Sequence, residues 1–216
     1  MEFPRPRSIG EVLYEMTLWL LFYPRTLWRV LLRPAEVGIP GEGAGTGEGE
    51  PGAELVSPPL FLMISILVAH ALDLAMRAEL GERADDLDLG LLVFRVVAFS
   101  LFPLVMATGA LKREGRPIDR QTLRGPFYLQ CFYTAPFAIS ASVALVLARS
   151  PAGPVRMAGA GLILAAVAWY LCVETRWLRS GLAVGPLRAF CAALRLFGLA
   201  LFFCLAFALL AFRPGR

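Results

Sequence analysis

The chain contains 216 residues, of which 57% are hydrophobic and only 18% are charged. Soluble domains average about 45–50% apolar residues, so this composition favours a protein of the lipid bilayer. The net charge of +4 arises from 21 lysine and arginine residues against 17 acidic ones. These basic residues flank long apolar runs instead of forming one basic face, which is typical of membrane topology and gives no reason to expect nucleic acid as a partner.

The first apolar stretch, residues 9–33, is interrupted by charged side chains. At the centre of a bilayer, Glu15 and Arg25 would each cost about 2.5–3.5 kcal/mol. Arg25, Arg29 and Arg33 recur at every fourth residue and therefore share one face of a helix. We predict that residues 1–33 form an N-terminal arm with an amphipathic interfacial helix, whose three arginines contact lipid headgroups. A sixth membrane span is the alternative.

Residues 34–57 are rich in glycine and glutamate and contain few side chains that a core could bury. Such a composition is typical of a flexible linker. The clustered glycines superficially resemble a phosphate-binding loop, but the GxxxxGK[ST] pattern is absent. We therefore expect a linker here and no nucleotide site.

Five later stretches are long enough to cross about 30 Å of hydrocarbon. The expected spans are residues 58–76, 89–111, 126–148, 155–173 and 187–212. The predicted fold class is all-α: a polytopic transmembrane bundle of five helices over residues 58–216, preceded by the interfacial helix. Four cysteines lie inside these spans without a CxxC pair, and we interpret them as small apolar fillers. No metal and no cofactor are expected.

The basic residues are unevenly divided between the two ends of the spans. Thirteen lie on the side of the N-terminal arm and six on the opposite side. The positive-inside rule then predicts a multi-pass protein with its N-terminus in the cytoplasm and its C-terminus outside. Because nearly all basic residues are arginine, a GC-rich bacterial genome and the bacterial inner membrane are expected. An acidic loop, interpreted as a solvated loop with a divalent-cation patch as the alternative, contains Glu79, Glu82, Asp85, Asp86 and Asp88.

The stretch "VAHALDLAM", residues 68–76, places the only histidine, His70, and Asp73 inside an apolar span. Asp73 lies about 8 Å below the outer face and Arg95 about 9 Å below the same face, at 1.5 Å per helical residue. These matching depths predict an ion pair between adjacent antiparallel helices, extended by His70 one turn away. With Gln130 they form the predicted intramembrane polar cluster. A structural clasp is favoured, and a proton or substrate path stays open.

The third span carries a small and polar stripe in which Thr134, Ala138 and Ser142 recur at every fourth residue. Small and hydroxyl-bearing residues let membrane helices approach closely, so we predict a packing surface, with a mobile binding helix as the alternative. Near the inner face, Glu174 ends the fourth span and Arg195 lies about 12 Å into the fifth. Because a long arginine can reach toward the surface, an inner-face ion pair between Glu174 and Arg195 is predicted.

Three stretches are informative together: the proline-rich start of the first span "SPPLF" (57–61), the loop and aromatic span "GRPIDRQTLRGPFYLQCFYTAPFAI" (115–139), and "GPLRAFCAALRL" (185–196). With the order of the five spans, they resemble the Yip1-domain membrane proteins. The resemblance covers residues 57–212 and implies a multi-spanning protein without enzyme activity. Its eukaryotic relatives act in membrane trafficking through protein partners, and its bacterial relatives are labelled permease-like. It implies no active-site residues, and the Arg25/Arg29/Arg33 stripe departs from the family pattern.

The sequence contains no nucleophile paired with a base: HExxH, GxSxG and a Walker lysine are all absent. We therefore expect a non-enzymatic membrane protein that organises lipids or membrane partners, either as a homo-oligomer or with other membrane proteins. The alternative is a small-molecule or lipid permease that uses the polar cluster as its path. A solvent-connected cluster would favour transport, and a sealed cluster would favour the clasp.

Overall fold

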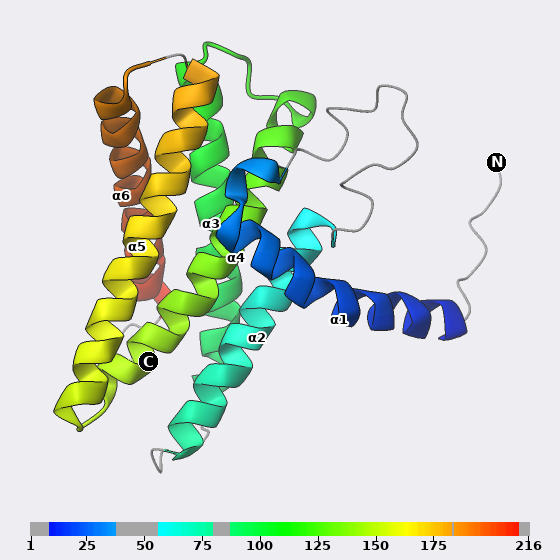
Figure 1. Ribbon diagram of the computed structural model, residues 1–216, viewed down its shortest axis with the longest axis vertical. Coiled ribbons are helices and arrows are strands. Elements are labelled where there is room, and N and C mark those ends of the chain that lie inside the picture. Colours follow the sequence, from blue (N-terminus) through cyan, green and yellow to red (C-terminus); the bar gives the residue numbers. More distant parts are fainter. Residues whose placement is uncertain (1–8, 38–55, 80–86, 183, 212–216) are drawn as a thin grey trace.

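The computed structural model describes residues 9–37, 56–79, 87–182 and 184–211, which fold into six α-helices and one short 3₁₀ helix (Figure 1). The elements are α1 (Ile9–Leu32), η1 (Pro34–Glu36), α2 (Pro58–Glu79), α3 (Leu87–Arg113), α4 (Arg120–Arg149), α5 (Gly153–Leu182) and α6 (Pro186–Ala211). Of the predicted acidic loop, Glu79 ends α2 and is exposed, residues 80–86 lie outside the described part, and the side chain of Asp88 is not described.

Helices α2 to α6 are each long and apolar enough to cross a membrane. They confirm the predicted all-α bundle, and successive helices run in opposite directions (Figure 1). The chain is therefore a multi-spanning membrane protein. The C-terminal part of α1 lies beside the bundle at an angle to the spans (Figure 1), and α1 is not among the candidate spans found in the described residues. It is one continuous helix with Pro24 inside it, and its position at the membrane surface stays a prediction.

Helix α4 is the centre of the bundle. Two thirds of its most apolar window is buried, compared with a third or less for each other span. Every residue from Leu129 to Ala138 is buried, because α2, α3 and α5 all pack against this helix. The predicted stripe Thr134, Ala138 and Ser142 is buried along its whole length, which confirms it as a packing surface.

The N-terminus of α4 is fixed by a capping box outside the span. The Asp119 carboxylate accepts hydrogen bonds from the backbone N–H groups of Thr122 at 2.9 Å and Gln121 at 2.8 Å. These two donors lower the pKa of Asp119, because they stabilise its charged form. The cap therefore sets where the loop from α3 ends and where α4 begins.

The C-terminal end of α1 is fastened to the spans by hydrogen bonds. Tyr23 pairs with Ser65 of α2 at 3.0 Å, and the Trp169 indole of α5 donates to the Leu31 carbonyl at 3.2 Å. Val37 and Val56 are also buried. The predicted linker is therefore too long at both ends: residues 34–36 form η1, and each flanking valine anchors the chain to the core. Residues 38–55 lie outside the described part.

Helices α4 and α5 approach each other closely at Gly159. A Cβ added to Gly159 would lie 2.6 Å from the backbone nitrogen of Ala148 and 2.8 Å from the carbonyl oxygen of Ala144. Only glycine fits there without moving a backbone. Gly161, two residues later, is exposed, and a Cβ there would meet nothing within 4 Å.

The substitution Gly159→Ala should therefore lower the melting temperature of the full chain in detergent. Overpacking against backbone atoms typically costs about 1–3 kcal/mol. Gly161→Ala is the matched control, and its melting temperature should stay constant or rise, because alanine favours helix over glycine. Equal melting temperatures for the two variants, measured by thermal unfolding, would contradict the close approach of α4 and α5.

Candidate functional site

The predicted ion pair between α2 and α3 is present. A guanidinium nitrogen of Arg95 lies 3.0 Å from Oδ1 of Asp73, and the other lies 3.1 Å from Nδ1 of His70. All three residues are buried, with exposed fractions of the whole residue of 9% for His70, 3% for Asp73 and 7% for Arg95. Arg77, one turn beyond Asp73, donates to its other carboxylate oxygen, Oδ2. We call these four residues the α2–α3 ion cluster.

The hydrogen bonds of the ion cluster determine which ring nitrogen of His70 carries the hydrogen. A guanidinium can only donate, so Nδ1 of His70 accepts from Arg95 and the ring hydrogen lies on Nε2. Arg95 joins His70 to Asp73, and both carboxylate oxygens of Asp73 are engaged by arginines. None of the three cavities described below is lined by these residues. This is the geometry of a clasp that neutralises a charge between two helices.

Gln130 does not belong to this cluster, so that part of the prediction is wrong. Its amide nitrogen donates to Oε2 of Glu174 on α5 at 2.9 Å, and both side chains are fully buried. Gln130 lies toward the start of α4 and Glu174 toward the end of α5, which meet on one side of the bundle. Asp73 lies toward the end of α2 and Arg95 toward the start of α3, which meet on the other side. The two polar groups therefore occupy different depths of the bundle.

The predicted ion pair between Glu174 and Arg195 is also wrong. Among the described residues no ion pair joins the two, because Glu174 faces α4 and is buried while Arg195 is exposed on α6. The arginine reaches the surface, where it lines a cavity. Reaching the surface spares Arg195 the cost of burial, but it also separates Arg195 from Glu174.

Two more polar residues adjoin the Gln130–Glu174 pair. Thr134 is one turn after Gln130 on α4, and Tyr170 is one turn before Glu174 on α5; both are fully buried. We call these four residues the α4–α5 polar cluster. Sequence reasoning overlooked Tyr170, although its spacing of four residues from Glu174 places both on one helix face. Within the described residues, four oxygens of the cluster lack a hydrogen-bond partner: Gln130 Oε1, Thr134 Oγ1, Tyr170 Oη and Glu174 Oε1.

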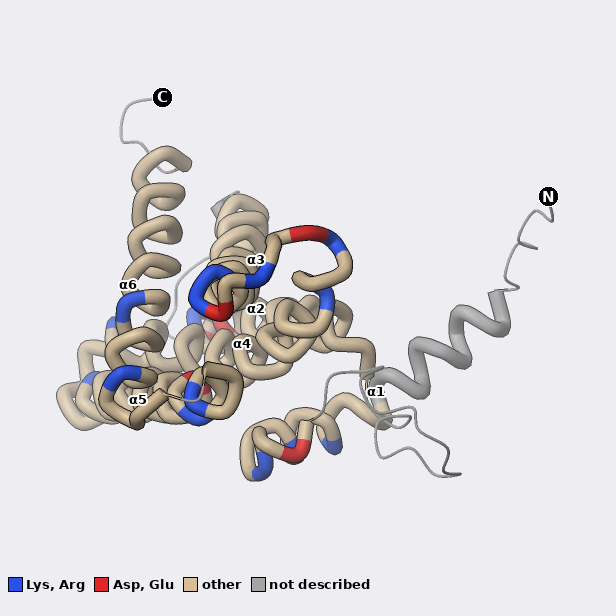
Figure 2. The backbone as a smooth tube through the Cα atoms, turned by 90° about the horizontal axis from the view of Figure 1, so that it is seen from above, with Lys and Arg blue, Asp and Glu red and all other residues tan. Residues whose placement is uncertain are grey.

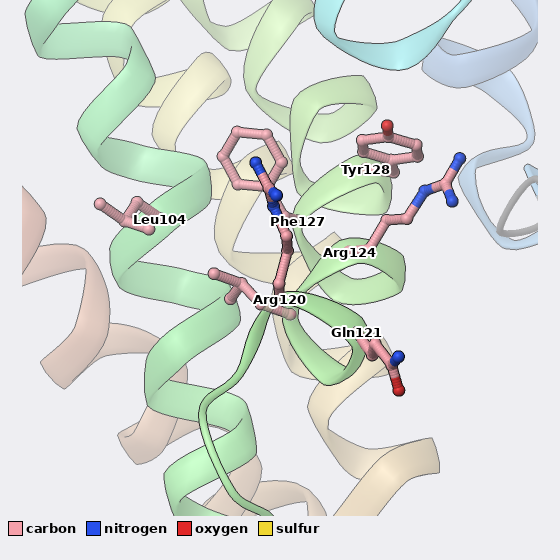
Figure 3. A pocket seen from close by; sticks show the side chains of 7 residues that line it. Leu104, Arg120, Gln121, Arg124, Phe127 and Tyr128 are labelled. Carbon is pink, nitrogen blue, oxygen red and sulfur yellow. The ribbon is translucent and has the colours of Figure 1, made fainter. Parts of the chain in front are cut away.

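Three surface cavities lie at one end of the described bundle. Lysines and arginines gather at this end (Figure 2). The largest, about 710 Å³, lies between α3 and the first turns of α4, where Arg124 stacks over the Tyr128 ring at 5.4 Å (Figure 3). A second, about 650 Å³, lies between α3 and α6. The third, about 500 Å³, is lined by Arg113, Leu182, Val184, Leu187, Arg188, Cys191, Ala192 and Arg195. We call this third one the arginine cavity.

The three arginines predicted to contact lipid are on the C-terminal half of α1 and the residue after it. Arg25 and Arg33 are exposed and Arg29 is half-buried. Arg33 lies 3.5 Å from Glu36 in an exposed ion pair, which contributes little to stability. Their contact with lipid headgroups stays a prediction.

No family model, curated protein or solved structure matches this chain. The resemblance to the Yip1-domain proteins is therefore neither supported nor contradicted. Among the described residues, no group of three or more histidine, cysteine or acidic side chains could hold a metal ion. The arrangement offers two interior polar clusters and one basic, partly apolar surface.

Arg95→Gln should destabilise the protein more than Arg77→Gln. Removing one partner of a buried ion pair typically costs about 3–5 kcal/mol, because the other charge stays buried. Arg77 also binds Asp73, but from the same helix and with a more exposed side chain, 17% against 8%, so its loss does not separate two helices. Thermal unfolding in detergent tests the ranking, and a larger fall for Arg77→Gln would contradict the role of Arg95.

Proposed function

We propose that this is a non-enzymatic membrane protein that binds anionic phospholipids at its arginine-rich end and thereby organises lipids or membrane partners. The arginine cavity carries the proposal. Arg113, Arg188 and Arg195 line it together with five uncharged residues and no acidic side chain. A guanidinium group pairs well with a phosphate, often through two parallel hydrogen bonds.

The location of the arginine cavity suits a phosphodiester with acyl chains. Helix α6 begins at Pro186, so the backbone N–H groups of its first turn, beside Arg188, favour an anion. Leu182 of α5 and Leu187 of α6 supply apolar walls on the same cavity. Basic pockets between spans on the cytoplasmic side are typical binding sites for anionic headgroups.

The basic residues outside the arginine cavity also favour this end of the bundle as the lipid-binding face. The cavity between α3 and α4 contributes Arg120 and Arg124, and the sequence assigns thirteen basic residues to this side of the spans. Within the proposal this end is cytoplasmic, the membrane is the bacterial inner membrane and the protein is Yip1-like. An anionic inner leaflet would then attract the basic face at close range.

A permease that conducts small molecules or lipids is the alternative. It would need His70, Asp73, Arg95 and Gln130 to line one continuous path. Gln130 instead belongs to a separate cluster, and all four side chains are buried. This separation favours the clasp over a transport path.

Phosphatidylglycerol should raise the melting temperature of the detergent-purified full chain more than phosphatidylcholine does. A ligand present at 100 times its Kd stabilises the folded state by about 2.7 kcal/mol. The stabilisation should disappear in the double variant Arg188→Gln/Arg195→Gln and persist in the control Arg156→Gln, whose exposed arginine lies near the start of α5 at the opposite end.

Inorganic phosphate at the same concentration serves as a further arm of this experiment. If the site requires acyl chains as well as a phosphate group, phosphate alone should stabilise the protein far less. Equal stabilisation by the two lipids, or an undiminished effect of phosphatidylglycerol on the double variant, would refute the proposal.

A further inference from the structure

The α4–α5 polar cluster contains a carboxyl group whose hydrogen bonding is incomplete. Glu174 is fully buried, and its Oε2 accepts the amide N–H of Gln130 at 2.9 Å. The second carboxylate oxygen, Oε1, has no hydrogen-bond partner among the described residues, and neither has Oε1 of Gln130. In each of the two side chains, one polar atom has a hydrogen-bond partner among the described residues and the other, an oxygen, has none.

Among the described residues, no ion pair compensates the charge of Glu174. Arg188 and Arg195 of α6, the helix on the other face of α5, are exposed, and no described ion pair includes Glu174. Glu36 of η1 is exposed and pairs with Arg33. The cluster therefore differs from the α2–α3 ion cluster, in which arginines engage Asp73.

The titratable neighbours of Glu174 carry no positive charge either. Among the described residues they include Tyr133 on α4 and Tyr170 on α5, and Cys131 of α4 interacts with Tyr170. The hydroxyl group of Tyr133 donates to the Pro34 carbonyl instead. A carboxylate in this setting would be shut off from bulk water and would have no counter-ion among the described residues, which is costly inside a bilayer.

One proton on Oε1 of Glu174 would satisfy both unpaired oxygens of the pair. An ionised carboxylate and an amide carbonyl oxygen can only accept hydrogen bonds, but a protonated carboxyl donates one. Glu174 Oε1 would then donate to Gln130 Oε1 while Gln130 Nε2 continues to donate to Glu174 Oε2. The two groups would form a cyclic acid–amide pair with a hydrogen bond in each direction.

We propose that Glu174 and Gln130 form a proton-binding site in the interior of the bundle. Glu174 takes one proton from a hydronium ion, whose O–H bond breaks to leave water, and the new O–H bond at Oε1 makes the carboxyl group neutral. The hydroxyl groups of Tyr170 and Thr134 lie beside the pair. When the proton leaves, a rotated Tyr170 O–H supplies Oε1 with a replacement hydrogen bond. In the protonated state Oε1 thus donates to Gln130 Oε1, and in the ionised state it accepts from Tyr170, while Oε2 accepts from Gln130 Nε2 in both.

The amide orientation favours a proton over a sodium ion. The N–H group of Gln130 points at the carboxylate, and the positive end of that dipole would repel a metal cation bound between the two carboxylate oxygens. A proton is covalently held by one oxygen and leaves the Gln130 hydrogen bond intact. The site therefore takes a proton, and a sodium ion is the outcome that the experiment must exclude.

Infrared spectroscopy of the full chain in phosphatidylcholine vesicles measures the C=O stretch of a protonated carboxylic acid directly. The wild type should show this band at neutral pH, and the band should shift in ²H₂O because the proton exchanges. Glu174→Gln should abolish it. Asp73→Asn is the matched control, since Asp73 is a buried carboxylate engaged by arginines, and the band should persist in that variant.

Two further measurements keep the proposal testable if Glu174→Gln fails to fold. Glutamate labelled with ¹³C at its carboxyl carbon should move the band of the wild-type protein, which assigns the band to glutamate. Gln130→Met keeps the carboxyl group but removes the acid–amide pair, so the band should move to higher frequency. Absence of the band at neutral pH would overturn the proposal, and so would its replacement by a carboxylate band when sodium chloride replaces choline chloride.

Discussion

A charge inside a bilayer must be neutralised within the protein, because no water is available to solvate it. In this bundle that constraint is met by Arg95, whose two terminal nitrogens contact Asp73 on the neighbouring helix at 3.0 Å and His70 at 3.1 Å. The interaction joins α2 to α3, and α4 packs against both of these helices. The position of the buried central helix therefore depends on the ion cluster that holds its two neighbours together.

The two polar clusters meet the same constraint by different chemistry and at different depths. The α2–α3 ion cluster pairs opposite charges, whereas the α4–α5 polar cluster contains neutral amide and hydroxyl groups around one carboxyl group. Neither lines any of the three surface cavities. The described cavities lie at the basic end, where arginines lie beside apolar walls. The buried polar groups and the exposed arginines therefore lie in separate parts of the bundle.

The spans and the Asp73–Arg95 contact could be predicted from sequence because each depends on one dimension, distance along a helix. The partner of Gln130 could not, since it depends on which face α4 turns toward α5, and several neighbours pack around α4. The depth of Arg195 in the span also led to the wrong ion pair, because its long side chain reaches the surface and does not contact Glu174. The buried ends of the linker depend on single valines, Val37 and Val56, which form no periodic pattern.

A double-mutant cycle between Asp73→Asn and Arg95→Gln tests the central claim most directly. The unfolding free energies of the wild type, both single variants and the double variant would be measured by chemical denaturation in the same detergent. If the ion pair joins α2 to α3, the double variant should be less destabilised than the sum of the single variants, with a coupling energy of about 0.5–3 kcal/mol. Additive effects would show that the two side chains stabilise the bundle independently, and would contradict the clasp.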